Sequence, residues 1–277
     1  MDSLAGLHKR TKGGIVQKSR KMKDYLTGRS KPKGIDVLCS LKHFAIITYA
    51  VPAERYQGLF PERFQLDTVQ INGQAMGLIS VVPFIDVDFT SAVFPFPKFT
   101  MGQTNYRIYI IDTETGERCV WFLGTTLDSW TLAVPRYVWN LPWYAGKISF
   151  DCSLNEATGL YDKYQMTTQS DWAEASVELV QSESDSFDFP GFPDTESALV
   201  YLTQPLAGFY YRRDKKLGTY RVWHTELEVK PATLQSAQFK LLSDLGIVKQ
   251  SEQCSPYSVL IESINEFTIY LPPTVIG

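Results

Sequence analysis

Apolar and alternating runs separated by Pro, Gly, Asn and Asp fill most of the chain and predict β-strands. Cys39–Val51 is largely apolar with a partial alternation, and Pro52 ends it because proline lacks the amide donor of a strand ladder. Tyr106–Asp112 and Arg118–Thr125 are predicted strands joined by a tight turn at Asp112–Gly116. The other predicted strands are Gly73–Phe84, Gly146–Leu154, Lys163–Thr168, Ala175–Leu179, Leu199–Leu202, Phe209–Arg212, Tyr220–Val229 and Val259–Ile261.

Only three segments favour helices. Ala53–Phe60 suits a short helix, and Ser129–Val134 suits another that Pro135 ends. After Pro231, apolar residues recur at helical spacing up to a capping Gly246, which predicts a packing helix (Leu234, Ala237, Leu241, Leu242, Leu245). The strand spacing indicates one mainly β domain, an antiparallel β-barrel or sandwich with a few short helices, over residues 38–277. Residues 180–195, rich in Ser, Asp, Glu and Pro, are expected to form an exposed loop.

Composition agrees with this fold class. The 277 residues are 44% hydrophobic, 21% charged and 13% aromatic, as in globular proteins in which aromatic side chains favour strands. The longest uncharged stretch, Thr68–Ile85, is broken by Gln, Asn, Gly and Pro, so no membrane span is predicted. The four cysteines show no metal-ligand spacing and are expected to be buried, reduced thiols.

The charge is unevenly distributed. The net charge is −3, yet residues 1–34 hold ten Lys or Arg against two Asp, and few apolar residues. Residues 1–37 are therefore predicted to be a basic, disordered arm, for which nucleic acid is not the expected partner. The first 35 residues contain no apolar segment of the kind that a secretory signal needs, so a cytoplasmic location is expected. A homo-oligomer is compatible with the sequence.

The chain lacks the common sequence motifs that indicate a particular catalytic or cofactor-binding function. The chain has no phosphate-binding glycine loop, no dinucleotide fingerprint, no G-x-S-x-G elbow and no H-E-x-x-H. Neither a cofactor nor a metal is therefore expected. His224 and Glu226 are two residues apart on a predicted strand, where they suit either a metal or acid–base pair or, more simply, a hydrogen-bonded structural histidine.

A family resemblance becomes visible between Thr104 and Phe150. Asn105–Ile110 (NYRIYI), Trp121–Leu123 (WFL) and Pro135–Ala145 (PRYVWNLPWYA) resemble the DUF2071 (YqjF-like) family, a relative of acetoacetate decarboxylase. The resemblance extends more weakly over residues 38–246. It implies an antiparallel β-barrel of the acetoacetate decarboxylase-like type around a buried, mostly apolar pocket.

The departures from that superfamily concern its chemistry. Its decarboxylases carry R-E-x-x-G-[FY]-P-K-K, in which the first lysine forms a Schiff base. In this chain Arg136 and Pro142 match the pattern, but Trp143 and Tyr144 replace both lysines. The resemblance therefore implies no decarboxylation by the Schiff-base route unless another lysine, such as Lys147 or Lys98, reaches the pocket. Whether the protein is an enzyme is left open.

What remains of the motif region suits ligand binding. Aromatic walls and one or two guanidiniums would hold a small apolar or carboxylated molecule, with or without transforming it. The predicted ligand-binding residues are Arg136, Arg107, Tyr106, Trp139, Trp143 and Tyr144. Tyr106 and Arg107 are neighbours on a strand, so they cannot both point inward, and Arg136 is the preferred anchor. The alternative is a non-catalytic scaffold that docks through its basic arm; such a barrel is expected to be filled with side chains, whereas a ligand barrel keeps a cavity with a charged group.

Overall fold

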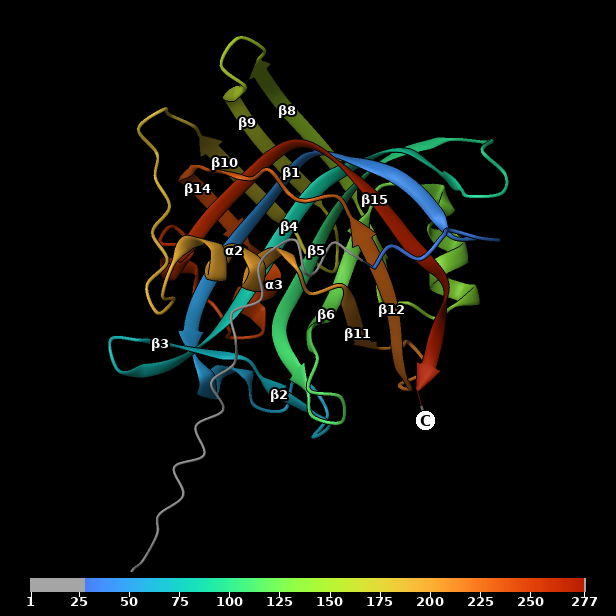
Figure 1. Ribbon diagram of the computed structural model, residues 1–277, viewed down its shortest axis with the longest axis horizontal. Helices are drawn as coiled ribbons and strands as arrows, with labels where there is room; N and C mark the ends of the chain where they lie inside the picture. Colours follow the sequence, from blue (N-terminus) through green and yellow to red (C-terminus); the bar gives the residue numbers. More distant parts are fainter. Residues whose placement is uncertain (1–27, 277) are drawn as a thin grey trace, which may run out of the picture.

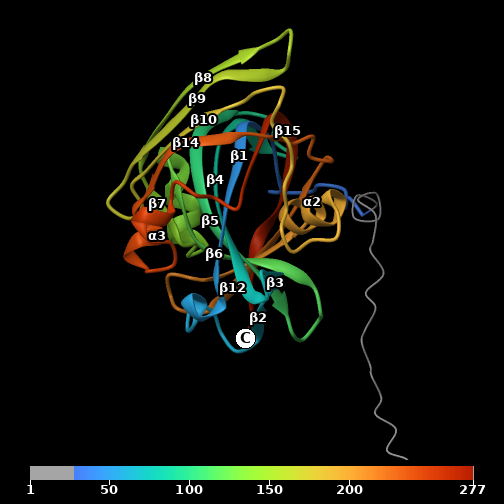
Figure 2. The same ribbon diagram turned by 90° about the vertical axis from the view of Figure 1, so that its left-hand side faces the viewer.

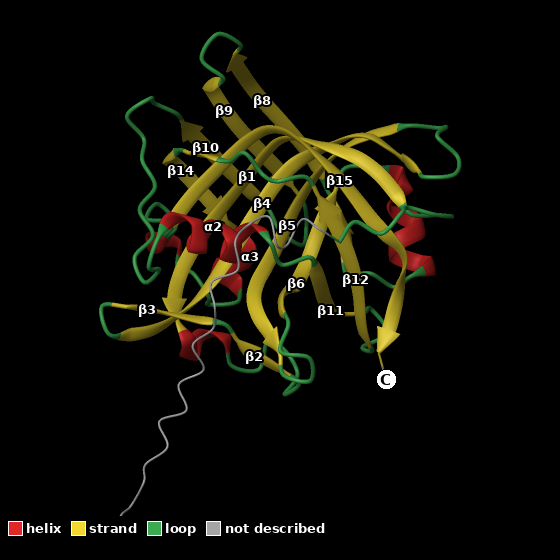
Figure 3. Ribbon diagram, in the orientation of Figure 1, coloured by secondary structure: helices red, strands yellow, loops and turns green. Residues whose placement is uncertain are grey.

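Strands dominate the computed structural model, which describes residues 28–276. Figures 1 and 3 show long, curved strands with short helices at their edges. The strands are β1 (Val37–Pro52), β2 (Phe64–Leu66), β3 (Thr68–Ile71), β4 (Gln74–Ser91), β5 (Phe99–Asp112), β6 (Arg118–Leu127), β7 (Trp143–Ala145), β8 (Lys147–Asn155), β9 (Leu160–Gln169), β10 (Ala175–Val180), β11 (Ala207–Tyr211), β12 (Leu217–His224), β13 (Lys230–Pro231), β14 (Thr233–Phe239) and β15 (Ser258–Ile276). The helical elements are α2 (Thr195–Thr203), α3 (Lys240–Asp244), the 3-10 turns η1 (Ala53–Tyr56), η2 (Trp130–Leu132) and η4 (Gln250–Glu252), and the π-helical turn η3 (Val134–Val138).

The larger sheet is continuous around a ring of strands. Its order is β2-β5-β4-β1-β15-β12-β11-β6-β7, and β5 also pairs with β6. The hydrogen-bonded pairings therefore run from β5 through β4, β1, β15, β12, β11 and β6 back to β5. The predicted hairpin turn is confirmed, since the Gly116 amide donates to the Asp112 carbonyl at 2.7 Å and Gly116 has a φ of +71°.

The sheet is mixed, so the prediction of a purely antiparallel sheet is wrong. Most pairs in the ring are antiparallel, but β11 pairs with β6, and β6 with β7, in parallel. The chain arrives at β11 through α2 and at β7 through η2 and η3. These helical connections carry it back to the same end of the sheet before the next strand begins, which is what a parallel pairing requires.

A second, four-stranded sheet covers one face of the ring. Its order is β14-β10-β9-β8, and Figure 2 shows it outside β4 and β5. Tyr106 and Ile108 of β5 pack with Tyr164, Met166 and Val177 of this sheet in one core, in which all five side chains are buried. The alternate residues of β5 face the opposite side, toward the inside of the ring.

Two segments adopt a different structure from the one predicted. Residues 199–202 lie in α2, not in a strand, because the Asp194 side chain accepts a hydrogen bond from the Ser197 amide at 2.7 Å and starts a helix. Most of the helix predicted after Pro231 is strand β14, which pairs antiparallel with β10. Only Lys240–Asp244 is helical, and Gly246 follows it with a φ of +67°.

Smaller corrections concern the short helices and the cysteines. The first predicted helix covers only Ala53–Tyr56, and the second continues through Val138, because a proline is tolerated in the first turn of η3. Cys39 and Cys119 are buried as expected, whereas Cys152 is partly exposed and Cys254 is exposed.

Residues 28–36 lie against the body of the protein. The Arg29 guanidinium stacks over the Trp223 ring at 4.2 Å, and the Tyr270 hydroxyl donates to the Ser30 carbonyl at 2.9 Å. The Asp36 carboxylate is buried and accepts from the Leu271 amide at 2.8 Å. The rest of the predicted arm, residues 1–27, lies outside the described residues.

Candidate functional site

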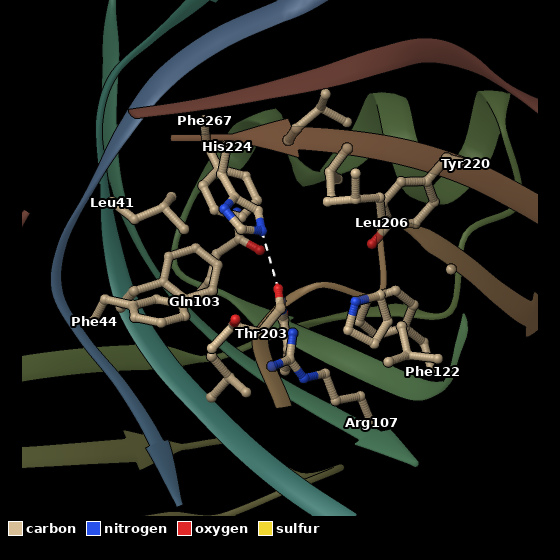
Figure 4. A pocket seen from close by; sticks show the side chains of 18 of the residues that line it. Leu41, Phe44, Gln103, Arg107, Phe122, Thr203, Leu206, Tyr220, His224 and Phe267 are labelled. Carbon is tan, nitrogen blue, oxygen red and sulfur yellow. Dashed lines mark hydrogen bonds between the residues drawn. The ribbon is translucent and has the colours of Figure 1, made fainter. Parts of the chain in front are cut away.

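A cavity of about 80 Å³ lies inside the ring of strands. All seven strands of the ring contribute to its wall, as does the segment that links α2 to β11. Apolar side chains form most of the wall (Leu41, Phe44, Val82, Phe84, Phe122, Phe267), and the polar or charged ones are Asp86, Gln103, Asn105, Arg107, Thr203, Tyr220 and His224. Figure 4 shows the heads of Arg107 and His224 directed into the opening between aromatic and aliphatic side chains.

Strand β5 supplies three of the polar groups. Gln103, Asn105 and Arg107 occupy alternate positions, so they share the face of β5 that looks into the cavity. Tyr106 faces the other side, where it is fully buried and packs edge-on against Trp172 at 5.7 Å between ring centroids. Of these two neighbouring residues, Arg107 therefore points into the cavity and Tyr106 lies in the core between the two sheets.

The Arg107 guanidinium is held at the C-terminal end of α2. One terminal nitrogen donates to the Leu202 carbonyl at 3.0 Å and lies 3.4 Å from the Tyr109 hydroxyl, which also donates to the Leu202 carbonyl at 3.1 Å. The last carbonyls of a helix carry partial negative charge and favour a cation there. Arg107 Nε is buried and has no hydrogen-bond partner.

Asp86 places a carboxyl group in the same wall. Its side chain is 1% exposed, and Oδ2 accepts a hydrogen bond from the Gln103 side chain. Oδ1 has no partner. Burial raises the pKa of Asp86 from its usual value near 4 to about 7, while the hydrogen bonds from Gln103 and Cys39 lower it.

His224 bridges two backbone carbonyls at the edge of the cavity. Nδ1 lies 2.7 Å from the Thr225 oxygen and Nε2 lies 3.0 Å from the Thr203 oxygen, and the ring stacks on Phe267. Burial lowers the pKa of His224, against these two hydrogen bonds. These contacts support the interpretation as a structural histidine. Among residues 28–276, no group of three or more His, Cys, Asp or Glu side chains is arranged to hold a metal ion.

The structure brings only two of the six predicted binding residues to the cavity, Arg107 and Trp143. Arg136 instead donates to the Trp143 carbonyl and lies over the Tyr144 ring at 5.1 Å. Tyr144 stacks on Trp172 at 4.1 Å between centroids. Trp139, half-buried at the end of η3, is not part of the cavity wall either. Arg136 therefore supports the strand that carries Trp143 from outside the cavity.

Several residues of the cavity wall were not anticipated, namely Asp86, Gln103, Asn105 and Tyr220. The sequence does contain a signal for two of them. Gln103 and Asn105 continue the alternate positions of Arg107 in a strand whose other face is apolar. Polar residues at every second position of a buried strand indicate a polar stripe facing an internal space.

The lysines considered as Schiff-base candidates lie elsewhere. In the described part of the chain, no lysine contributes to the cavity wall. Lys147 is exposed in β8, and exposed Lys98 pairs with Asp88 at 2.7 Å. No helix in residues 28–276 is long and apolar enough to cross a membrane.

Comparison with solved structures places the fold among acetoacetate decarboxylase-like proteins. An acetoacetate decarboxylase-like enzyme from Sphingomonas wittichii RW1 matches with a TM-score of 0.54 and 11% identity, over 88% of this chain and 94% of that one. An acetoacetate decarboxylase matches with a TM-score of 0.52 and 13% identity, over 92% and 97%. The enduracididine biosynthesis enzyme MppR, solved with HEPES buffer bound, matches with a TM-score of 0.50 and 12% identity, over 90% and 89%.

Sequence comparison identifies the family. No curated protein matches the chain. The family model DUF2071, described as "Uncharacterized conserved protein", matches residues 39–262, which include β4, β5, β6, β11 and β12 of the ring entirely, most of β1 and the first residues of β15. The chain belongs to the DUF2071 family.

Proposed function

We propose that the protein binds a short carboxylic acid in the cavity, with Arg107 as the anchor for the carboxylate. The observation that carries this proposal is the Arg107 guanidinium, which is fixed by the α2 carbonyl at 3.0 Å and keeps a buried Nε without a partner. A half-buried guanidinium with a free, buried Nε donor in a mostly apolar wall suits a planar carboxylate. Arg136, the anchor preferred from the sequence, has its donor on the Trp143 carbonyl and lies outside the cavity.

The size of the cavity limits the ligand. One water molecule needs roughly 10–15 Å³ of such space, so a cavity of about 80 Å³ takes on the order of six water-sized groups. An acid of about six or seven non-hydrogen atoms fits this volume. A long-chain fatty acid does not, and the fold relative with HEPES bound is a precedent for small-molecule binding in this fold.

The ring of strands acts, in this proposal, as a barrel that encloses the ligand. A scaffold is expected to fill its interior with side chains, whereas this interior keeps a cavity with Asp86 and Arg107 in its wall. That observation favours ligand binding over the scaffold alternative, whose basic arm lies mostly outside the described residues. A cytoplasmic location and a homo-oligomeric state stay predictions from the sequence.

Any chemistry in this site proceeds without a Schiff base. The two lysines of the decarboxylase pattern are replaced by Trp143 and Tyr144, and no lysine of the described residues contributes to the wall. Only an amine forms an imine with a keto acid. The groups available for proton transfer in the cavity are the Asp86 carboxyl and the His224 imidazole.

Calorimetric titration of purified protein with acids of two to five carbons tests this function. Arg107→Leu removes a charge-assisted hydrogen bond, for which about 1.5–3 kcal/mol is typical, so affinity is expected to fall roughly 10- to 150-fold. Arg136→Ala is the matched control, since it removes an arginine outside the cavity and is expected to change affinity less than about threefold. Circular dichroism verifies that both variants fold. Absence of binding by every acid, or equal affinities of wild type and folded Arg107→Leu, would falsify the proposal.

A further inference from the structure

Two hydrogen-bond acceptors in the cavity wall have no donor. Asp86 Oδ1 and Asn105 Oδ1 are both buried without a partner among residues 28–276, although each residue contributes to the cavity wall. A buried acceptor left unpaired is costly, and native proteins keep few of them. Unpaired acceptors that face a cavity therefore indicate a donor that arrives with the ligand.

These acceptors lie along the same wall as the carboxylate anchor. Gln103, Asn105 and Arg107 alternate on β5, about 6.6 Å apart from one to the next. Asp86 is fixed at the Gln103 end of this row, because the Gln103 amide donates to its Oδ2. Arg107, the only side chain of the four that carries a positive charge, occupies the other end. The hydrogen-bond donors of Arg107 therefore lie at one end of this row, and the unpaired oxygens of Asn105 and Asp86 lie at its middle and at its other end.

We propose that the ligand is a short hydroxy acid, whose carboxylate binds Arg107 and whose hydroxyl donates its one proton to one of the two unpaired oxygens, Asp86 Oδ1 or Asn105 Oδ1. This inference rests on the function proposed above and adds the identity of the ligand's second polar group. The hydroxyl pairs an acceptor that an unsubstituted or methoxy acid leaves unpaired. It also fits a cavity that takes about six or seven non-hydrogen atoms.

A ketone and an ammonium complement this wall less well. A ketone oxygen only accepts hydrogen bonds, so it leaves the ionised Asp86 carboxylate without a donor. An ammonium donates, but removing a full positive charge from water into an apolar wall costs more than removing a hydroxyl. Burial raises the pKa of Asp86 to about 7, so the carboxyl is mostly ionised at pH 8, and a buried ammonium beside it still needs its own loss of hydration compensated. A neutral donor needs no such compensation.

Matched acids separate these ligand classes. Calorimetric titration at pH 8 compares 2- and 3-hydroxybutyrate with butyrate, 3-methoxypropionate, 3-aminobutyrate and acetoacetate, each of which has six or seven non-hydrogen atoms. At least one hydroxybutyrate is expected to bind about 10-fold or more tightly than butyrate, the methoxy compound and acetoacetate, because only the hydroxyl supplies a donor to a charged acceptor. The amino acid is expected to bind no better than butyrate.

Variants assign the preference to the two acceptors. In at least one of the variants Asp86→Asn and Asn105→Leu, the ratio of hydroxybutyrate to butyrate affinity is expected to fall at least threefold, while butyrate affinity itself stays within about twofold. Asp88→Asn, which changes an exposed carboxylate farther along the same strand, serves as the control and is expected to leave the ratio unchanged.

The outcomes distinguish this inference from the function on which it rests. If all six acids bind equally and all depend on Arg107, the hydroxyl assignment is wrong and the carboxylate site stands. Tighter binding of 3-aminobutyrate or acetoacetate than of both hydroxy acids also overturns the hydroxyl assignment, as does a preference that survives in both acceptor variants. If none of the six acids binds even when the acid is in large molar excess over the protein, the proposed function itself fails.

Discussion

Replacing Asp86 with asparagine is expected to stabilise the protein at alkaline pH and to leave it nearly unchanged at acidic pH. The Asp86 carboxyl is fully buried, and its pKa in the folded protein is about 7 against an ordinary value near 4. Between these two values the folded protein retains a proton that the unfolded chain has lost. The free energy of unfolding therefore falls as the pH rises through this window, and the asparagine variant lacks that loss.

The size of the effect follows from the shift. A difference of one pKa unit corresponds to about 1.4 kcal/mol, and most of the shift of roughly three units is expressed between pH 5 and pH 8. Between pH 5 and pH 8 the free energy of unfolding of the wild-type protein is therefore expected to fall by about 2.5 kcal/mol. The Asp86→Asn variant is expected to lack this decrease. The substituted amide conserves volume and still accepts from Gln103. Urea unfolding of both proteins at pH 5, 6, 7 and 8 measures the difference.

Asp88→Asn provides the control for this experiment. Asp88 is exposed on the same strand and pairs with exposed Lys98 at 2.7 Å, an ion pair that solvent screens to within about 1 kcal/mol. Its replacement is expected to leave the pH dependence of wild type largely intact. Parallel pH profiles of wild type and Asp86→Asn would refute the argument that burial raises the pKa of Asp86.

Two further predictions concern the core and the missing lysines. Gln253 is fully buried, and its side-chain amide donates to the Phe239 carbonyl at 3.1 Å and accepts from the Phe239 amide at 2.6 Å. Gln253→Leu is therefore expected to lower the free energy of unfolding, measured in urea, by about 2–4 kcal/mol. A loss under about 1 kcal/mol would contradict the role of these hydrogen bonds. Borohydride reduction with acetoacetate is expected to leave every lysine unmodified in mass spectra, because the described cavity wall contains none, whereas Trp143→Lys provides a positive control. A reduced adduct on a lysine of the wild-type protein would show that an amine reaches the ligand.

Most of the strands could be predicted because one face or both faces of each are buried. The alternation in β1 and β5 and the turn at Asp112–Gly116 are local signals, and the structure confirms the hairpin. Strand β15 is much longer than predicted, because Glu262, Asn265 and Glu266 interrupt its apolar run, whereas in the structure all three pair with residues of β1. The pairing of β1 with β15 joins residues more than 200 positions apart and leaves no mark on the local pattern.

The two errors of element type have separate physical causes. The apolar run Ala198–Leu202 lacks polar alternation and fits a buried strand as well as a helix, and the deciding signal was the Asp194 cap, which lies outside the run. In β14 the apolar residues fall at helical spacing, yet the segment pairs with β10 and keeps its other edge exposed. Tertiary pairing therefore overrode the local periodicity in β14, whereas in α2 a local cap decided between two structures that the apolar run allowed equally.

The candidate site was predictable only as far as one strand determines it. Neighbours on a strand face opposite sides, so only one of Tyr106 and Arg107 can point into the cavity. Tyr106 packs in the core between the two sheets, which leaves the cavity side to Arg107. The motif comparison directed attention to Arg136, but its side chain turns back to the Trp143 carbonyl. Asp86 comes from a different strand, β4, and its contact with Gln103 depends on the pairing of β4 with β5.

The position of Arg107 depends on a row of buried hydroxyls that spans three strands. Thr48 Oγ1 of β1 lies 2.8 Å from Ser80 Oγ of β4, which lies 2.9 Å from the Tyr109 hydroxyl of β5. The Tyr109 hydroxyl donates to the same Leu202 carbonyl that Arg107 binds. Because Tyr109 uses its only proton on Leu202, the hydrogen bond from Ser80 must run toward Tyr109, and the row has one direction.

These hydrogen bonds connect α2, which the sequence had predicted as a strand, to the candidate site. The end of α2 supplies the carbonyl of Leu202, so the helix, Tyr109 and Arg107 form one connected unit at the edge of the cavity. A connected buried network holds its members in one geometry, and a guanidinium held before a ligand arrives loses less entropy on binding. Arg107, the proposed carboxylate anchor, is therefore oriented by contacts from β1, β4, β5 and α2 together, which no single segment of the sequence contains.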